Sequence, residues 1–142
     1  MSRATVVSVI RELARCYQAF ERASDAHIRR MGLTPPQFDI VATLGNTPGM
    51  AFKELGSRTL ITKGTLTGVV DRLATRGLVE RAADPDDGRV SLVRLTDAGR
   101  ERIDRAAREL AAAGFGSFAA LDDGELGRLS GLLGALRRET PA

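Results

Sequence analysis

One side of the segment from residue 59 to residue 76 carries small, hydroxylic and cationic side chains, together with the carboxylate of Asp71. The other side repeats apolar residues at three- and four-residue steps, which predicts a short amphipathic helix. The predicted buried stripe consists of Leu66, Val69, Val70 and Leu73. Groups such as those on the free side can enter a nucleic-acid groove or meet a phosphate. The candidate contact residues are Thr62, Lys63, Gly64, Thr65, Thr67, Gly68 and Arg72.

The start of this predicted helix is a second feature suited to a phosphate. Thr62 precedes the helix, and its hydroxyl can cap the first turn. A helix N-terminus presents unpaired N–H groups and a partial positive charge, so a phosphate is a favourable anion there. From Lys53 to Arg81 there are six basic and three acidic residues, and this local excess of +3 equals the net charge of the whole 142-residue chain. An excess this small is also common on a solvated face, so it agrees with phosphate contact without deciding it.

The sequence after this segment predicts a β-hairpin with an arginine at its turn. Gly77 can end the helix, and the pattern then changes to a period of two over residues 78–81 and 90–95. The residues between them, Asp-Pro-Asp-Asp-Gly, are dense in turn formers. Arg89 would lie at or beside the tip, where its side chain can reach into a minor groove, and Asp87 can hold it in a fixed pose. Taken alone, the hairpin is equally well explained as a solvated turn in which aspartates fill turn positions.

The order of these elements resembles the multiple-antibiotic-resistance-regulator (MarR) family of bacterial transcription factors. The resemblance rests on LTPPQFDIVATL, FKELGSRTLITKGTLTGVVDRLATRGLVER and DPDDGRVSLVRLTDAGR, and it covers roughly residues 5 to 138. It implies a fold that is mainly α with a small β wing, a winged helix-turn-helix flanked by N- and C-terminal dimerisation helices. Residues 1–142 would then form a single domain. Its DNA-binding core would be at about 34–95, and its dimerisation helices at about 5–31 and 96–138.

The residues typical of the family's wing have matches in this chain. The family's usual wing arginine matches Arg89, and the aspartate just before it matches Asp87. The Leu-Thr-x-x-Gly that closes the wing matches Leu95, Thr96 and Gly99. The resemblance therefore implies that Arg89 and Asp87 belong to the DNA-binding set.

Two positions depart from the family pattern. Ala51 stands where many members have a serine or threonine cap for the helix before the recognition helix, which predicts a start weaker by roughly 1 kcal/mol. Gly68 stands where many members carry a cation on the groove-facing side. This second departure supports the alternative function, a winged-helix protein–protein interaction module without sequence-specific DNA binding.

A long apolar stripe near the N-terminus predicts a helix that meets another chain. The stripe recurs over about 25 residues, which is longer than one core contact requires. Its members are Val6, Ile10, Leu13, Tyr17, Phe20, His27 or Ile28, and Met31. A second helix is predicted after it, because Thr34 and Gln37 form a capping box with Pro35 in the first turn.

The C-terminal part of the chain predicts two more amphipathic helices. The first opens at Thr96, is expected to loosen around Gly114 and Gly116, and has Ile103, Ala107, Leu110 and Phe118 on its apolar side. The last starts with a capping box of Asp122 and Glu125. Twofold pairing is the economical way to cover such stripes. A homodimer would also place two recognition helices in successive grooves of a pseudo-palindromic operator in double-stranded DNA.

The predicted function is that of a dimeric, sequence-specific DNA-binding transcriptional regulator, a repressor rather than an activator. The resemblance also implies a small aromatic or phenolic effector that binds between the dimer helices and the winged helix and releases the repressor from DNA. The candidate effector-binding residues lie near the junction of the first two helices and are Tyr17, Phe20, His27 and Phe38. Core packing explains each of these side chains as well.

Catalytic and metal-dependent functions find no support in the sequence. The chain has no P-loop, and its single histidine, His27, has no nucleophile-elbow serine to activate. A calcium loop starting at Asp84 would need glycine at Arg89 and glutamate at Leu95. Cys16 and His27 would lie roughly 16 Å apart on one helix, too far to share a metal. No enzyme activity, cofactor or metal is therefore expected.

The sequence also predicts a cytoplasmic protein with no membrane partner. Charges occur too early and too often in the N-terminal region for a secretory signal, and no run of about 18 apolar residues exists. Cys16 is the single cysteine, which fits a reducing compartment. We expect Cys16 to be a small apolar residue of the helix stripe, without a redox role.

Overall fold

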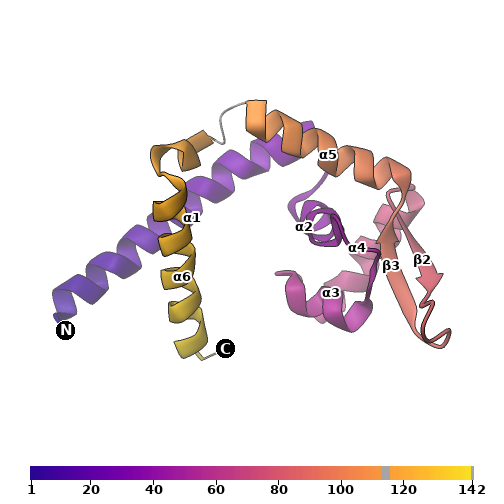
Figure 1. Cartoon of the computed structure of the whole chain (residues 1–142), viewed down its shortest axis with the longest axis horizontal. Coiled ribbons are helices and arrows are strands. Elements are labelled where there is room, and N and C mark those ends of the chain that lie inside the picture. Colours follow the sequence, from indigo (N-terminus) through magenta and orange to yellow (C-terminus); the bar gives the residue numbers. More distant parts are fainter. Residues whose placement is uncertain (113–115, 142) are drawn as a thin grey trace. The chain divides into compact units, whose positions relative to one another are not determined.

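The computed structural model describes residues 1–112 and 116–141, which form a mainly helical chain with a small antiparallel sheet (Figure 1). The elements in chain order are α1 (Arg3–Arg30), α2 (Pro35–Leu44), β1 (Met50–Ala51), α3 (Phe52–Arg58), α4 (Lys63–Thr75), β2 (Val79–Ala83), β3 (Ser91–Leu95), α5 (Asp97–Ala112), the 3₁₀ helix η1 (Gly116–Ala120) and α6 (Asp123–Glu139). The predicted fold class, mainly α with a small β wing, is confirmed.

The chain divides into two compact units, Met1–Asp104 and Arg105–Ala142, with the boundary inside α5. The first unit contains the helix-turn-helix and the hairpin. The second contains η1 and α6, and α6 begins with the predicted capping box, in which Asp122 Oδ1 accepts from Glu125 N at 2.8 Å and Glu125 Oε2 from Asp122 N at 2.9 Å. Placing Phe118 on the helix that opens at Thr96 was wrong, because α5 ends at Ala112 and Phe118 lies in η1. Gly114, where loosening was predicted, lies outside the described residues.

Local signals set the ends of the helices in the first unit. Thr34 and Gln37 form the predicted capping box at the start of α2. Gly77 ends α4 as predicted, with a φ of +72° that an L side chain rarely adopts. Its N–H donates to Ala74 O, and Leu78 N–H donates to Leu73 O at 3.0 Å, the hydrogen-bond pattern of a Schellman stop.

The sheet has the strand order β1-β3-β2, with both pairs antiparallel. β2 pairs with β3 from Val79 opposite Leu95 to Ala83 opposite Ser91, so the predicted hairpin is confirmed with ends shifted by one or two residues. β1 was not predicted. It has only two residues, Met50 and Ala51, and so short a strand carries no period-two pattern that a sequence could show.

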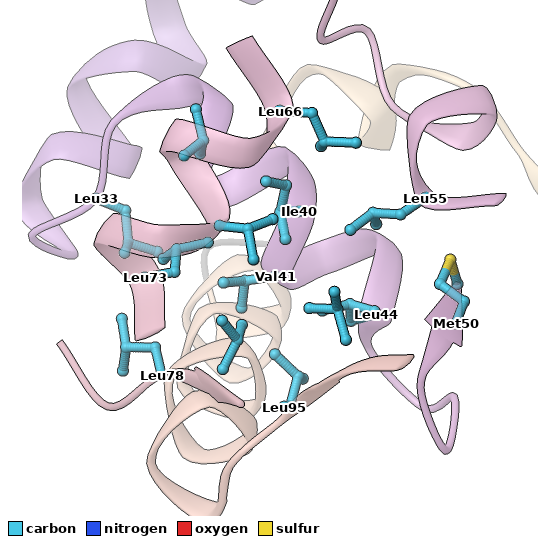
Figure 2. Close-up of a cluster of buried hydrophobic side chains, with 14 of the residues drawn as sticks. Leu33, Ile40, Val41, Leu44, Met50, Leu55, Leu66, Leu73, Leu78 and Leu95 are labelled. Atoms are coloured by element: carbon cyan, nitrogen blue, oxygen red, sulfur yellow. The ribbon is translucent and has the colours of Figure 1, made fainter. Parts of the chain in front are cut away.

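The hydrophobic core of the first unit lies between α2, α3, α4 and the sheet (Figure 2). Ile40 and Leu44 of α2 and Leu55 of α3 have no exposed surface. The predicted stripe of α4 is confirmed, since Leu66, Val69, Val70 and Leu73 are all buried. Burial of a side chain of this size stabilises a fold by about 1.5–3 kcal/mol, so this core fixes how α4 is held.

The long helix α1 leaves its apolar stripe exposed within the chain. Ile28 is its one buried residue, whereas Ile10 and Tyr17 are 59% and 54% exposed. A stripe of this kind has the chemistry of a surface that packs against a second chain. None of the helices in the described ranges is long and apolar enough to cross a membrane.

Candidate nucleic-acid interface

The outer side of α4 is a continuous exposed surface opposite the buried stripe. All of the predicted contact residues of this region are exposed: Thr62, Lys63, Gly64, Thr65, Thr67, Gly68 and Arg72. A Cβ atom added to Gly64 or Gly68 would meet nothing within 4 Å. This side of α4 is therefore bare at two positions one helical turn apart, so its backbone can approach a ligand closely.

The prediction that the Thr62 side chain caps α4 was wrong. Thr62 occupies the N-cap position, but its hydroxyl makes no capping bond to the backbone. The Thr62 and Thr65 hydroxyls lie 3.0 Å apart and bond to each other, while Thr65 N–H donates to Thr62 O at 3.0 Å. The Thr62 side chain bonds none of the N–H groups of the first turn, and Thr65 N–H already donates to Thr62 O. The donors left for an anion at this end of α4 are therefore the N–H groups of Lys63 and Gly64.

Two side-chain contacts that sequence reasoning missed hold the turn before α4. Asp39 of α2 accepts a hydrogen bond from Leu60 N–H at 2.9 Å, and the Thr59 hydroxyl donates to Leu55 O at 2.9 Å. Asp39 and Leu60 are 21 residues apart, so no local pattern marks them as partners. The bond to Asp39 attaches the turn between α3 and α4 to α2, and the bond to Leu55 attaches it to α3.

The other end of α4 is held by a glutamine that also caps α2. Gln37 Oε1 accepts from Thr34 N–H at 3.1 Å and from Arg76 Nη1 at 3.2 Å. Nearby, Arg102 Nη1 of α5 donates to Met31 O at 2.6 Å, just beyond α1. The loop between α1 and α2 is thus connected to both α4 and α5.

The hairpin presents Arg89 at its turn, as predicted, with 91% of the side chain exposed. Asp87 Oδ1 accepts from the backbone N–H and the Nε of Arg89, both at 3.1 Å, and Asp87 Oδ2 accepts from Nη2 at 3.4 Å. The hydrogen bonds from the Arg89 side chain, and then from its backbone N–H, lower the pKa of Asp87. Asp87 therefore stays ionised at neutral pH and holds Arg89, so the predicted contact is confirmed.

Other residues of the same turn support its backbone. Asp84 N–H donates to Val90 O, and the Asp84 carboxylate accepts from Asp86 N–H, both at 2.9 Å. Asp84 thus fills a turn position, as the solvated-turn interpretation predicts. Asp87 also bonds the turn backbone, and its carboxylate in addition holds the Arg89 side chain. The turn contains both aspartates that bond its backbone and an arginine held by Asp87, and contact of Arg89 with DNA stays a prediction.

Some cations near α4 have an acidic partner and others have none among the described residues. Arg58 pairs with Glu54 at 2.9 Å, and Arg81 pairs with Asp71 at 2.8 Å. Within residues 1–112 and 116–141, no carboxylate lies in ion-pair contact with Lys53, Lys63 or Arg72. Unpaired surface cations of this kind can meet phosphate oxygens without first breaking an ion pair.

The four candidate effector residues are in different surroundings. Tyr17 and Phe20 are about half exposed on α1, His27 is half-buried near the end of the same helix, and Phe38 packs against the core. Tyr17 and His27 are separated by about 15 Å along α1 at ~1.5 Å per residue. The hollow of about 530 Å³ on the first turns of α1, lined by Arg3, Val7 and Arg11 among others, includes none of the four. Their part in effector binding stays a prediction.

The described part of the chain contains no cluster of side chains suited to a metal ion. No group of three or more histidine, cysteine, aspartate or glutamate side chains there could hold a metal ion. Cys16 is exposed on α1.

A family model described as "MarR family" matches residues 31–90, which span the region from the end of α1 to the wing turn. The homoprotocatechuate degradative operon repressor of Escherichia coli is 34% identical over 83 residues, which cover 58% of this chain and 56% of that protein. The chain spans 42% to 64% of the length of the first three curated relatives, all of which are named HTH-type transcriptional regulators.

Two solved structures are similar over most of the chain. A probable transcriptional regulator from Pseudomonas aeruginosa has 41% identity and a TM-score of 0.62, with 85% of this chain and 92% of that chain covered. The PcaV transcriptional regulator from Streptomyces coelicolor, crystallised with its natural ligand, has 28% identity and a TM-score of 0.68, with 89% and 92% covered.

Proposed function

Because the chain belongs to the MarR family, we propose that it is a sequence-specific DNA-binding transcriptional regulator that acts as a homodimer. The observation that carries this proposal is the exposed side of α4, with its bare glycines and unpaired cations, in the same unit as an arginine held at the wing turn. A face of this kind suits a major groove, because it combines close approach with phosphate contacts.

In the proposed complex, α4 is the recognition helix. Its first turns, from Thr62 to Thr67, enter the major groove, and Gly68 lets the backbone approach the groove closely. Lys63 and Arg72 meet phosphates or base edges. Arg89, held by Asp87, enters the flanking minor groove, where a narrow A·T-rich stretch attracts a guanidinium.

The homodimer is supported by the apolar surfaces at both ends of the chain. The stripe of α1 is exposed, and in the second unit the leucines of α6 are exposed as well, including Leu132 at 57% and Leu136 at 50%. A second copy that covers such stripes also generates a twofold axis, which a pseudo-palindromic operator matches. In this proposal residues of about 5–31 and 96–138 serve dimerisation and about 34–95 form the DNA-binding core of one domain.

The regulator is proposed to repress transcription in the cytoplasm and to be released by a small aromatic effector. A relative named as the homoprotocatechuate degradative operon repressor supports this direction of control. Tyr17, Phe20, His27 and Phe38 remain the proposed effector contacts. A thermal-shift screen of aromatic acids, followed by alanine substitution at the four positions, tests the idea. A ligand response that survives all four substitutions in a folded protein would discard it.

The DNA-binding proposal is tested by titrating the purified chain against labelled duplexes from its own upstream intergenic region and against scrambled versions of them. We expect a clear preference for one native duplex, with an affinity that falls steeply between two salt concentrations because phosphate contacts release counterions. Equal, salt-insensitive weak binding to native and scrambled duplexes would contradict the proposal and favour the protein–protein interaction module.

A further inference from the structure

The guanidinium of Arg81 joins three elements of the first unit. Arg81 lies in β2, and its Nη2 donates to Asp71 Oδ1 of α4 at 2.8 Å. The same guanidinium lies over the ring of Phe52, the first residue of α3, 5.0 Å from the ring centroid. One side chain therefore connects the base of the wing, the middle of the recognition helix and the start of the helix before it.

Asp71 occupies an unfavourable place for a helix that approaches DNA. It is the one acidic residue of α4, and it follows Thr67 by four residues and Gly68 by three. Those spacings place it on the same side of the helix as the bare groove-facing surface. Its side chain is 59% exposed, so a carboxylate without a partner would direct a full negative charge toward the phosphates.

We propose that Arg81 is a positioning residue for DNA binding, which neutralises Asp71 and sets the placement of the wing base against the recognition helix. This inference rests on the proposed function. The ion pair directs the Asp71 carboxylate toward the wing, and the stacking on Phe52 holds the guanidinium in place. The recognition helix then presents its hydroxyls, glycines and cations to DNA without an unpaired opposing charge.

Stability of the fold does not account for this arrangement. Both partners are about half exposed, and ion pairs at such places contribute little to folding because water and salt screen them. The chain contains a matched pair for comparison: Arg94 Nε donates to Glu80 Oε1 at 2.8 Å, with similar exposure, but both residues belong to the hairpin. That pair connects neither strand to α4.

The test compares the wild-type chain with Arg81→Met, Asp71→Asn and the double variant, each titrated against the native upstream duplex that the wild type prefers. Methionine keeps an apolar stem over Phe52 and removes the charge. We expect Arg81→Met to bind about tenfold more weakly, because Asp71 then faces the phosphates without its partner. Asp71→Asn should bind at least as tightly as the wild type. The double variant should return to within about threefold of the wild type, which is the outcome that identifies charge masking.

The controls separate masking from other roles of Arg81. Arg94→Met should stay within about threefold of the wild type, and the Tm of Arg81→Met should move little. A double variant as weak as Arg81→Met would overturn the inference, because the arginine would then be acting on DNA or on the fold by itself. Unchanged affinity of Arg81→Met would overturn it too. A wild-type chain without any duplex preference would instead overturn the proposed function, so the two failures are distinguishable.

Discussion

Arg89→Ala is expected to weaken binding to the preferred duplex by about 1–3 kcal/mol while the free energy of unfolding stays almost unchanged. The side chain is 91% exposed and its bonds are to Asp87 in the same turn, so its removal disturbs no buried group. A guanidinium in a minor groove loses both its contact and its charge on truncation. Fluorescence anisotropy with the labelled duplex measures the affinity, and urea unfolding measures the stability.

Two neighbouring aspartates give this prediction its controls. Asp87→Asn removes the carboxylate that orients Arg89, so we expect an intermediate loss of affinity. Asp86 lies in the same turn, and the bond shown for it involves its backbone N–H, so Asp86→Asn should bind like the wild type. If unfolding free energy falls as far as binding does in Arg89→Ala, then Arg89 supports the fold and the proposed minor-groove role is wrong.

Gly99→Ala is expected to destabilise the fold by about 3 kcal/mol, at the upper end of the usual range for an added methyl group in a tightly packed place. A Cβ at this position would collide with the carbonyl oxygen of Leu78 and come within 3.1 Å of its carbonyl carbon. The backbone there cannot easily yield, because Leu78 O already accepts from Thr96 N–H at 3.1 Å and Gly77 O accepts from the Thr96 hydroxyl at 2.5 Å. The start of α5 is thus in close contact with Gly77 and Leu78, the residues between α4 and β2.

Gly68→Ala is the matched control for this effect. It adds the same methyl group at a helical position where nothing lies within 4 Å. It should therefore raise the free energy of unfolding by about 0.5–1 kcal/mol, because alanine favours the helix. Urea unfolding of both variants gives the comparison. Equal stability of Gly99→Ala and the wild type would show that α5 does not depend on close contact with Leu78.

The parts of the fold that sequence reasoning predicted are those encoded by residues close together in the chain. Thr34 and Gln37 are three residues apart, and their reciprocal capping bonds formed as expected. Gly77 ended α4 because few other residues adopt its backbone conformation. The contact between Asp87 and Arg89 was predictable for the same reason, since only one residue separates them.

The parts that were missed or wrong depend on distant partners or on a choice between local bonds. Arg81 meets Asp71 across 10 residues, and Arg102 meets Met31 across 71, and no spacing rule marks such pairs. At Thr62 the residue type and position were right for a cap, yet the hydroxyl bonds to another threonine hydroxyl instead. Local propensity gives the elements, while the contacts that orient the recognition surface come from tertiary packing.

The central claim, that two copies present two recognition helices to one operator, is tested most directly by selecting duplexes from a random-sequence library with the purified chain. The account predicts an enriched inverted repeat whose half-site centres lie about one helical turn, or ~10 base pairs, apart or a multiple of it. It also predicts two chains bound per selected duplex. Enrichment of a sequence without twofold symmetry, or no enrichment at all, would contradict it.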